Sequence, residues 1–179
     1  MALYKGEDKI KDIYLGDVPI FKVYAGEEFC GFFTFSHENL ISNSDLLIDS
    51  DSDGVPDGFV YSKATDISLT NGIAKFTATA QKANLIFTLS GFNTQTIYVF
   101  ARFKTDGDVR LLLSPTIVYH SGSGQFEYLS LIQTLSSDTC YPQISDRRTS
   151  GWTPIEVDYM GAINITDLVS RGILPSGLT

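Results

Sequence analysis

Hydrophobic and polar positions alternate along most of the chain in short runs that have the length of β-strands. The runs are rich in β-branched and aromatic residues, and they end at Gly, Pro, Asn or Asp, which favour turns. No stretch of helix length keeps a helical period. The runs that predict strands are 59–61, 67–69, 73–76, 85–89, 96–103, 109–113, 117–119, 126–132 and 155–160.

Closely spaced strands without a long helix predict an all-β fold, namely a jelly roll or another β-sandwich. Asn71-Gly72 lies between two of the runs and is a typical turn sequence of a tight hairpin. One short helix is predicted over residues 165–170, and Gly172 follows it in a C-cap position.

A short unit of tyrosine, any residue, glycine and an acid recurs every ten residues near the N-terminus. Its copies are Tyr4-Lys5-Gly6-Glu7, Tyr14-Leu15-Gly16-Asp17 and Tyr24-Ala25-Gly26-Glu27. Ten residues suit one strand and one turn, so residues 3–35 are predicted to form three or four short strands that turn at the three glycines. A meander of this size is marginal in water and needs a surface to pack on. That surface belongs either to the same chain or to another one.

The predicted domain organisation has two parts. Residues 1–35 form the β-meander, and residues 36–179 form the jelly-roll β-sandwich with its short C-terminal helix. The polar stretch Ser36-His37-Glu38-Asn39 is interpreted as a linker between them.

Composition excludes several classes of protein. The 179 residues carry a formal net charge of −8, which argues against binding to nucleic acid or to anionic lipid. No apolar run approaches the roughly 20 residues of a membrane span, and the start of the chain lacks the apolar region of a secretory signal. Cys30 and Cys140 fit neither a metal-binding spacing nor a disulfide-rich pattern.

The densest chemical signal is an acidic loop over residues 49–58. Its carboxylates repel one another, and a bound Ca²⁺ ion would turn that repulsion into attraction because calcium takes six to eight oxygen ligands. The candidate calcium ligands are the side chains of Asp49, Asp51, Asp53 and Asp57 and the backbone carbonyl of Val55.

The acidic loop departs from the EF-hand pattern. Position twelve is Val60, where an EF-hand has a bidentate glutamate, and flanking helices are not predicted. The loop more closely resembles the single-loop calcium motifs of thrombospondin type-3-like and dockerin-like repeats. The alternative is a solvated turn whose aspartates accept hydrogen bonds from their own backbone amides. If calcium binds, it fixes the approach to the strand over 59–61.

Catalytic interpretations find little support. His120 adjoins Ser121 in a Gly- and Ser-rich segment, but adjacent residues do not define a catalytic triad, and an exposed histidine in a hairpin turn is the simpler interpretation. Glu127, Glu156 and Asp158 lie in predicted strands, where salt bridges or solvent-facing positions account for them. The sequence therefore predicts a protein that is not an enzyme.

Aromatic residues offer a binding function instead. Trp152 and Tyr141, with Arg147 nearby, form a candidate platform on which sugar rings stack. The alternative is that Trp152 fills the core and that Tyr141 shapes a turn with Pro142.

Two parts of the sequence resemble proteins of the tailed-bacteriophage virion. The first is the N-terminal pattern of Ile10-Lys11-Asp12-Ile13-Tyr14-Leu15-Gly16-Asp17, repeated to Glu27. The second is the body, with Asn39-Leu40-Ile41-Ser42-Asn43, Asp53-Gly54-Val55-Pro56-Asp57-Gly58-Phe59 and Asp158-Tyr159-Met160-Gly161-Ala162-Ile163-Asn164-Ile165-Thr166-Asp167-Leu168. This body resembles the carbohydrate-binding-module-like jelly rolls of such proteins. In that family an aromatic residue, usually Trp, follows the Pro-Asp-Gly turn, and here it is Phe59. Family members often continue past the point where this chain stops.

The resemblance implies a virion structural protein that is a head fibre, a capsid decoration or a tail appendage, assembled in the host cytoplasm. Its partners would be capsid or other virion proteins, and it would form a homodimer or homotrimer. The N-terminal repeats would attach it to the particle, with Tyr14, Leu15, Phe21, Val23 and Tyr24 as the attachment residues. The sandwich would face outward. The alternative function is a carbohydrate-binding module that recognises glycans on the host surface.

Overall fold

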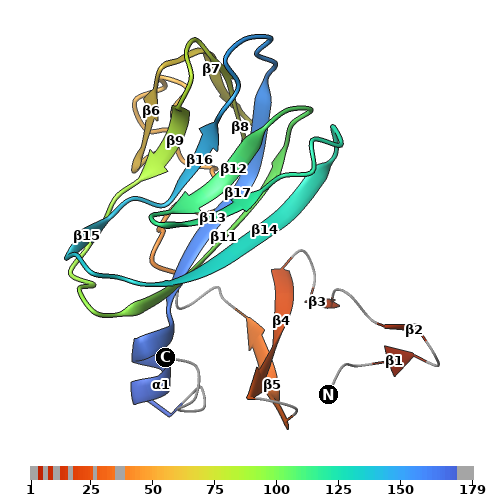
Figure 1. Cartoon of the computed structure of the whole chain (residues 1–179), viewed down its shortest axis with the longest axis vertical. Helices are drawn as coiled ribbons and strands as arrows, with labels where there is room; N and C mark the ends of the chain where they lie inside the picture. Colours follow the sequence, from red (N-terminus) through yellow and green to blue (C-terminus); the bar gives the residue numbers. More distant parts are fainter. Residues whose placement is uncertain are drawn as a thin grey trace.

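The computed structural model describes residues 39–172 in full and the backbone of five short strands before them. Residues 39–172 form two five-stranded antiparallel sheets that pack face to face, which confirms the predicted all-β sandwich (Figure 1). In spatial order, sheet I contains β14 (Phe126–Thr134), β11 (Thr96–Lys104), β17 (Ile155–Asn164), β8 (Ile73–Ala78) and β7 (Ala64–Thr70). Sheet II contains β13 (Thr116–Tyr119), β12 (Val109–Leu113), β16 (Gln143–Asp146), β9 (Ala83–Phe87) and β6 (Phe59–Ser62). A separate pair joins β10 (Leu89–Ser90) to β15 (Thr139–Cys140).

One hydrophobic core lies between the sheets. Sheet I contributes fully buried side chains such as Phe76 and Phe103, and sheet II contributes Leu85, Leu111 and Ile144. Along β8 every second residue is buried, as expected for a strand that covers a core on one side only. The remaining half of each strand therefore forms an outer face of the sandwich.

The hairpin of β7 and β8 turns where the sequence predicts it. Asn71 and Gly72 both have positive φ angles, 52° and 74°. A two-residue hairpin with a type I′ turn requires positive φ at both central residues. The strands pair from Thr70 opposite Ile73 onward. The hairpin turn predicted at Asn71-Gly72 is therefore confirmed.

Within the two five-stranded sheets, β16 is the strand that the sequence pattern fails to predict. It occupies the middle of sheet II, yet its burial does not alternate: Ile144, Ser145 and Asp146 are all buried. Buried polar residues remove the period of two on which strand prediction depends. Strand β17 also runs four residues beyond its predicted end, to Asn164.

The short helix α1 spans Ile165–Ser170, as predicted. Asn164 is its N-cap, and the side-chain oxygen of Asn164 accepts a hydrogen bond from the Asp167 amide at 3.0 Å. Gly172 follows the helix with a φ of 69°. In the part of the chain that the structure describes, no helix is both long and apolar enough to cross a membrane.

The outer face of sheet I is largely occupied by its own side chains. Phe100 stacks on Tyr98 and on Tyr159, with ring centroids 5.5 and 5.6 Å apart, and Leu168 of α1 joins this cluster. Arg102 pairs with Asp158 at 2.5 Å and lies over the Phe126 ring at 4.8 Å. The predicted salt-bridge role of Asp158 and Glu156 is confirmed, since Glu156 pairs with Lys104 at 3.2 Å.

The N-terminal region contains five short strands. They are β1 (Tyr4–Lys5), β2 (Asp8–Lys9), β3 (Ile13–Leu15), β4 (Val18–Ala25) and β5 (Glu28–Thr34). Strand β1 pairs with β2, and β3, β4 and β5 form a three-stranded antiparallel sheet. The predicted turns at Gly6, Gly16 and Gly26 lie outside the described residues. So do the side chains of the predicted attachment residues, whose backbones lie in β3 and β4.

Asn39 belongs to the sandwich and not to a linker. It forms a bridge with Ile163 of β17, and its side-chain oxygen accepts hydrogen bonds from the amides of Ala162 (3.0 Å) and Ile41 (3.1 Å). The prediction of a linker over 36–39 is therefore wrong at Asn39, because this side chain satisfies backbone groups at the edge of β17. The rest of that stretch lies outside the described residues.

Candidate functional site

The outer face of sheet II places ten side chains in two rows that cross its five strands. Because Leu85, Leu111 and Ile144 point into the core, their neighbours along each strand point outward. The strand register aligns the first row, called here the polar row: Ser62, Asn84, Ser145, Arg110 and Tyr119. It also aligns the second, called here the apolar row: Val60, Ile86, Gln143, Leu112 and Ile117.

The middle of the polar row is buried and incompletely hydrogen-bonded. Ser145 is 1% exposed and Arg110 is 9% exposed. Within the described residues, four buried side-chain atoms have no hydrogen-bond partner, and two of them, Arg110 Nε and Asn84 Oδ1, are in this row. Such an atom costs about 1–3 kcal/mol when it is left unpaired. The polar row therefore contains one donor and one acceptor whose hydrogen-bonding capacity the described residues leave unused.

Large exposed side chains surround this buried centre. Tyr119, at one end of the polar row, is 56% exposed, and Tyr141, two residues before Gln143, is 52% exposed. Val60 and Ile117 are exposed at the two ends of the apolar row. Flat aromatic rings beside a few polar groups are an arrangement that binds sugar rings.

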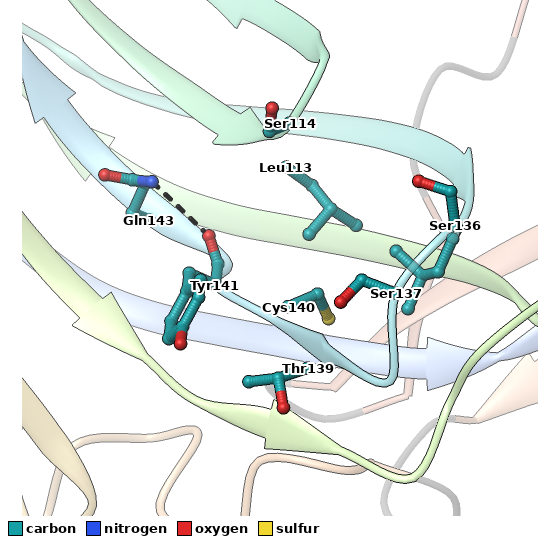
Figure 2. Close-up of a pocket in the computed structure, with 9 residues that line it drawn as sticks. Leu113, Ser114, Ser136, Ser137, Thr139, Cys140, Tyr141 and Gln143 are labelled. Carbon is teal, nitrogen blue, oxygen red and sulfur yellow. Dashed lines mark hydrogen bonds between the residues drawn. The ribbon is translucent and has the colours of Figure 1, made fainter.

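A cavity of about 220 Å³ lies at the Tyr141 end of sheet II (Figure 2). Hydroxyl groups of Ser114, Ser136, Ser137 and Thr139 line it, together with Leu113, Leu135, Cys140, Tyr141 and Gln143. Gln143 belongs both to the apolar row and to this cavity, so the two features are continuous. Burial raises the pKa of the Cys140 thiol to about 11, so this side chain is a neutral thiol and not a nucleophile.

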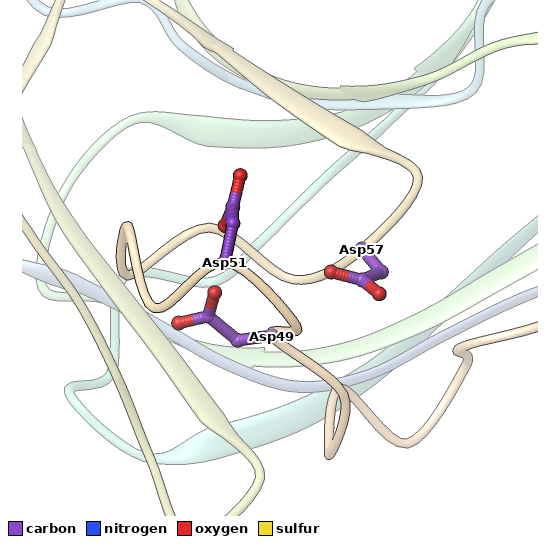
Figure 3. A group of neighbouring side chains, drawn as sticks. All are labelled: Asp49, Asp51 and Asp57. Carbon is purple, nitrogen blue, oxygen red and sulfur yellow. The ribbon is translucent and has the colours of Figure 1, made fainter.

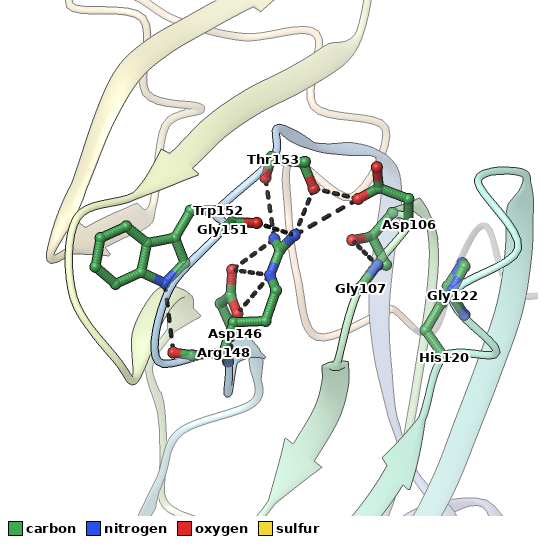
Figure 4. A network of polar contacts seen from close by, with 10 residues as sticks. Asp106, Gly107, His120, Gly122, Asp146, Arg148, Gly151, Trp152 and Thr153 are labelled. Atoms are coloured by element: carbon green, nitrogen blue, oxygen red, sulfur yellow. Dashed lines mark hydrogen bonds and ion pairs between the residues drawn. The ribbon is translucent and has the colours of Figure 1, made fainter.

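A second polar network holds the loop that follows β16 (Figure 4). Arg148 binds the fully buried Asp146 with two nitrogens, Nε at 3.1 Å from Oδ1 and Nη2 at 2.7 Å from Oδ2. Arg148 also contacts Asp106 and Thr153. A Cβ atom on Gly107 would lie only 2.6 Å from the Arg148 guanidinium, which explains the glycine at this position. The network gives the Asp146 carboxylate its hydrogen-bond partners from within the protein. Arg148 is therefore not free to bind an anion from outside.

The predicted aromatic platform is divided by strand β16. Tyr141 precedes the strand and lines the cavity, whereas Arg147 and Trp152 follow the strand. Trp152 is half-buried, and its indole Nε1 donates a hydrogen bond to the carbonyl of Arg148 at 3.3 Å (Figure 4). The structure therefore places Tyr141, and not Trp152, against the cavity.

The acidic loop brings three of its predicted ligands together (Figure 3). Asp49, Asp51 and Asp57 each offer a carboxylate oxygen, and these oxygens lie within 4.8 Å of one another, close enough to hold a metal ion. Asp53 is not in this group, and its side chain accepts a hydrogen bond from the Val55 amide at 2.7 Å.

The same carboxylates bind the backbone of their own loop, which is the alternative that the sequence left open. Asp49 accepts hydrogen bonds from the amides of Asp53 and Gly54, and Asp57 accepts one from the amide of Ser50 at 2.9 Å. Gly54 has a φ of 84°, so the sharp turn at this point favours glycine. The loop thus has its shape from hydrogen bonds of its own.

Asn43 joins the two ends of the acidic loop, a role that the sequence analysis did not assign. This side chain is 2% exposed. Its amide group donates to the carbonyls of Ile48 (2.7 Å) and Asp57 (3.3 Å), and its oxygen accepts from the Ile48 amide. Close to the loop, burial and then the negative charge of Asp53 raise the pKa of Tyr61, so Tyr61 is a neutral phenol.

His120 is buried, so the expectation of an exposed histidine is wrong. Its Nδ1 accepts from the Gly122 amide at 2.9 Å, which assigns the proton to Nε2, next to the carbonyls of Phe103 and Gln125. Both ring nitrogens are therefore engaged with the backbone. The hydroxyl of Ser121 binds Glu127 instead of the imidazole, so this segment has no nucleophile paired with a base.

The Ser- and Gly-rich turn after His120 also keeps Glu127 in its ionised, carboxylate form. Burial alone would raise its pKa, but hydrogen bonds from Ser121 and Ser123 and the nearby imidazole lower the pKa of Glu127 to about 2. The Ser123 hydroxyl donates at 2.6 Å. This carboxylate organises the turn between β13 and β14.

Comparison with solved structures identifies the fold. A structure described as "CBM4 structure and function" matches with a TM-score of 0.52 and 13% identity, over 69% of this chain and 99% of that one. An arabinose-bound α-L-arabinofuranosidase matches with a TM-score of 0.53 and 10% identity, over 71% of this chain and 26% of that longer one. A family 29 carbohydrate-binding module from Piromyces equi has a TM-score of 0.43 and 13% identity, over 65% of this chain and 89% of that one.

No protein-family model and no curated protein sequence matches the chain. At 13% identity, the structural likeness establishes the fold alone. The protein is an all-β sandwich of the carbohydrate-binding-module type with one short C-terminal helix.

Proposed function

We propose that the sandwich binds carbohydrate on the outer face of sheet II. The observation that carries this proposal is the polar row, in which a buried donor and a buried acceptor lack partners next to exposed tyrosines. Sugars present hydroxyl groups that donate and accept, and C–H faces that stack on aromatic rings, so they fit both features. The fold shared with a carbohydrate-binding module supports the proposal.

Affinity electrophoresis against a panel of polysaccharides, followed by calorimetry on those that bind, tests the proposed function. Tyr119→Ala and Tyr141→Ala should each weaken binding about tenfold, because each removes an exposed ring beside the site. Tyr128→Ala is the matched control, since Tyr128 is also exposed but lies on sheet I. Trp152→Ala tests the residue predicted from the sequence. Equal losses in Tyr119→Ala and Tyr128→Ala, or no binding to any glycan, would contradict this proposal.

For the acidic loop, we propose that the three clustered carboxylates bind Ca²⁺, which fixes the approach to β6. Calorimetry with Ca²⁺ should show binding that Asp51→Asn weakens, because this substitution removes one carboxylate ligand. Asp53→Asn is the matched control, since Asp53 lies outside the cluster and binds the Val55 amide. The absence of heat and of a melting shift at millimolar Ca²⁺, relative to EDTA, would exclude calcium.

A role in the phage virion, as a head fibre or capsid decoration protein, is a second proposal, and it rests on the repeats of the N-terminal region. Among the described strands, β3, β4 and β5 pair only with one another. A three-stranded sheet this small gains stability by packing on a larger surface. Residues 1–35 would supply attachment to other virion proteins, in a dimer or trimer, while the sandwich presents its glycan-binding face.

A further inference from the structure

The charge within the two rows of sheet II comes from a single residue. Among the ten outward positions of the two rows, Arg110 alone is charged. The neighbouring Asp146, next to Ser145 in sequence, is fully buried and is neutralised by Arg148. The protein has a net charge of −8, so an uncompensated cation at the centre of this face is unusual within it.

Arg110 is buried without an anion. No described acidic side chain forms an ion pair with it, whereas Arg102 and Arg148 both have carboxylate partners. Removing a guanidinium from water is costly unless charged or hydrogen-bonding groups replace the lost solvent. The contrast with the two other arginines indicates that the partner of Arg110 lies outside the described residues, and a bound ligand can supply it.

We propose that the polar row binds an acidic sugar, with the sugar carboxylate on Arg110. This inference rests on the proposed carbohydrate-binding function and adds the class of ligand. The planar guanidinium matches a carboxylate in shape and charge, and Nε is one of the donors that a side-on carboxylate engages. Tyr119 lies directly beside Arg110 in the register, where its ring can stack on the same sugar.

Asn84 supplies the second contact. Its Oδ1 is an acceptor without a partner, and a sugar hydroxyl is a donor. Arg110 and Asn84 lie on either side of Ser145, two strand spacings apart, which is about 10 Å between their backbones. An acidic ring and its neighbour in a polysaccharide can span this separation and contact both residues. The ligand class is therefore a uronic acid within a polymer.

The experiment compares an acidic polymer with its neutral counterpart and with a polymer that carries a different anion. Polygalacturonate and its carboxyl-reduced neutral form have the same linkage, and a sulfated glucan supplies an anion of different geometry. With the full chain, polygalacturonate or alginate should bind about tenfold or more tightly than the neutral form, and added salt should weaken binding. Arg110→Gln should abolish this preference.

Two further variants keep the test decisive if Arg110→Gln is poorly folded. Arg110→Lys keeps the charge but loses the planar fork, so it should bind the uronate less tightly than the wild type. Asn84→Asp places a carboxylate in the same row, so it should compete for Arg110 and also lower uronate affinity. Arg171→Gln is the matched control, because it removes an arginine at the end of α1, outside sheet II, and should leave the preference intact. Thermal unfolding reports the folding of each variant.

The outcomes separate this inference from the proposed function. Equal or tighter binding of the neutral polymer would overturn the inference while leaving carbohydrate binding in place. Binding of the sulfated polymer alone would overturn the carboxylate assignment, and so would a uronate preference that Arg110→Gln does not change. Failure to bind any polymer would overturn both.

Discussion

Individual charged residues in this sandwich differ in whether the chain itself supplies their partners. Arg148 has a buried carboxylate, a threonine and a glycine that makes room for it. Arg102 has Asp158 and an aromatic ring. Arg110 has neither among the described residues, although it is only 9% exposed. Because the cost of burying a charge depends on its partners, these three arginines have different roles despite their identical chemistry.

Glu127 gives the protein a measurable sensitivity to acid. Its pKa is about 2 in the folded state against a usual value of 4.5, so the carboxylate stabilises the fold above pH 4.5. That contribution should be lost as the pH falls from 4.5 to about 2. Glu127→Gln should reduce the free energy of unfolding at neutral pH by about 1 kcal/mol, since the group lies close to water. Urea unfolding of both proteins across this pH range measures the difference.

The difference between the wild type and Glu127→Gln should shrink at low pH. Ser123→Ala should reproduce part of the loss at neutral pH, because the Ser123 hydroxyl donates to this carboxylate. Parallel stability curves of the wild type and Glu127→Gln down to pH 2 would contradict the assignment.

The candidate site was only partly predictable at the level of residues. Tyr141 and the acidic loop stand out in the sequence, because exposed aromatics and closely spaced aspartates are local signals. Arg110 also has a local signal, since it interrupts the apolar run Val109-Arg110-Leu111-Leu112-Leu113. Its alignment with Asn84 and Ser145, however, depends on the register of three strands that are distant in sequence. No pattern within one strand contains that information.

Among the elements, α1 depends on its cap more than most helices do, because it has only six residues. Asn164→Ala should lower the free energy of unfolding by about 1 kcal/mol, since the Asp167 amide loses its acceptor. Asn164→Asp is the matched control and should retain most of the stability, because a carboxylate also caps a helix and suits its N-terminus. Chemical denaturation monitored by tryptophan fluorescence measures both. Equal stability of Asn164→Ala and the wild type would show that the cap contributes nothing.

The elements also show where sequence patterns succeed. Strand β8 alternates cleanly between buried and half-buried residues and was predicted to within two residues, because one side faces the core and the other does not. Strand β16 lies at the centre of sheet II with both Ser145 and Asp146 buried, so its pattern contains no such contrast. The order of strands in each sheet is set by contacts across the sequence and was not predictable from the pattern.

At the scale of the whole molecule, the two outer faces of the sandwich differ. The outer face of sheet I is filled by stacked rings, ion pairs and α1, whereas that of sheet II has exposed tyrosines around unpaired polar atoms. A sandwich needs only its inner faces for stability, so the outer ones are available for binding. This asymmetry favours sheet II as the binding side.

Deleting residues 1–35 tests whether particle attachment and glycan binding belong to separate parts of the proposed virion protein. The described core contacts lie within residues 39–172, so the truncated protein should fold and keep the proposed glycan binding. It should fail to enter phage particles, because it lacks the repeats that we propose for attachment. Purified particles grown with the truncated and full-length proteins, compared by mass spectrometry, measure incorporation. Normal incorporation of the truncated protein would contradict the attachment role.

The bridge between Asn39 and Ile163 brings the two ends of the sandwich side by side. The incoming chain at Asn39 and the outgoing chain at Asn164 are neighbours at one end of sheet I. A unit whose ends meet can be transplanted into a surface loop of a host protein without stretching either connection. Residues 39–172, in which α1 forms the start of the outgoing connection, should therefore tolerate insertion into such a loop as one unit.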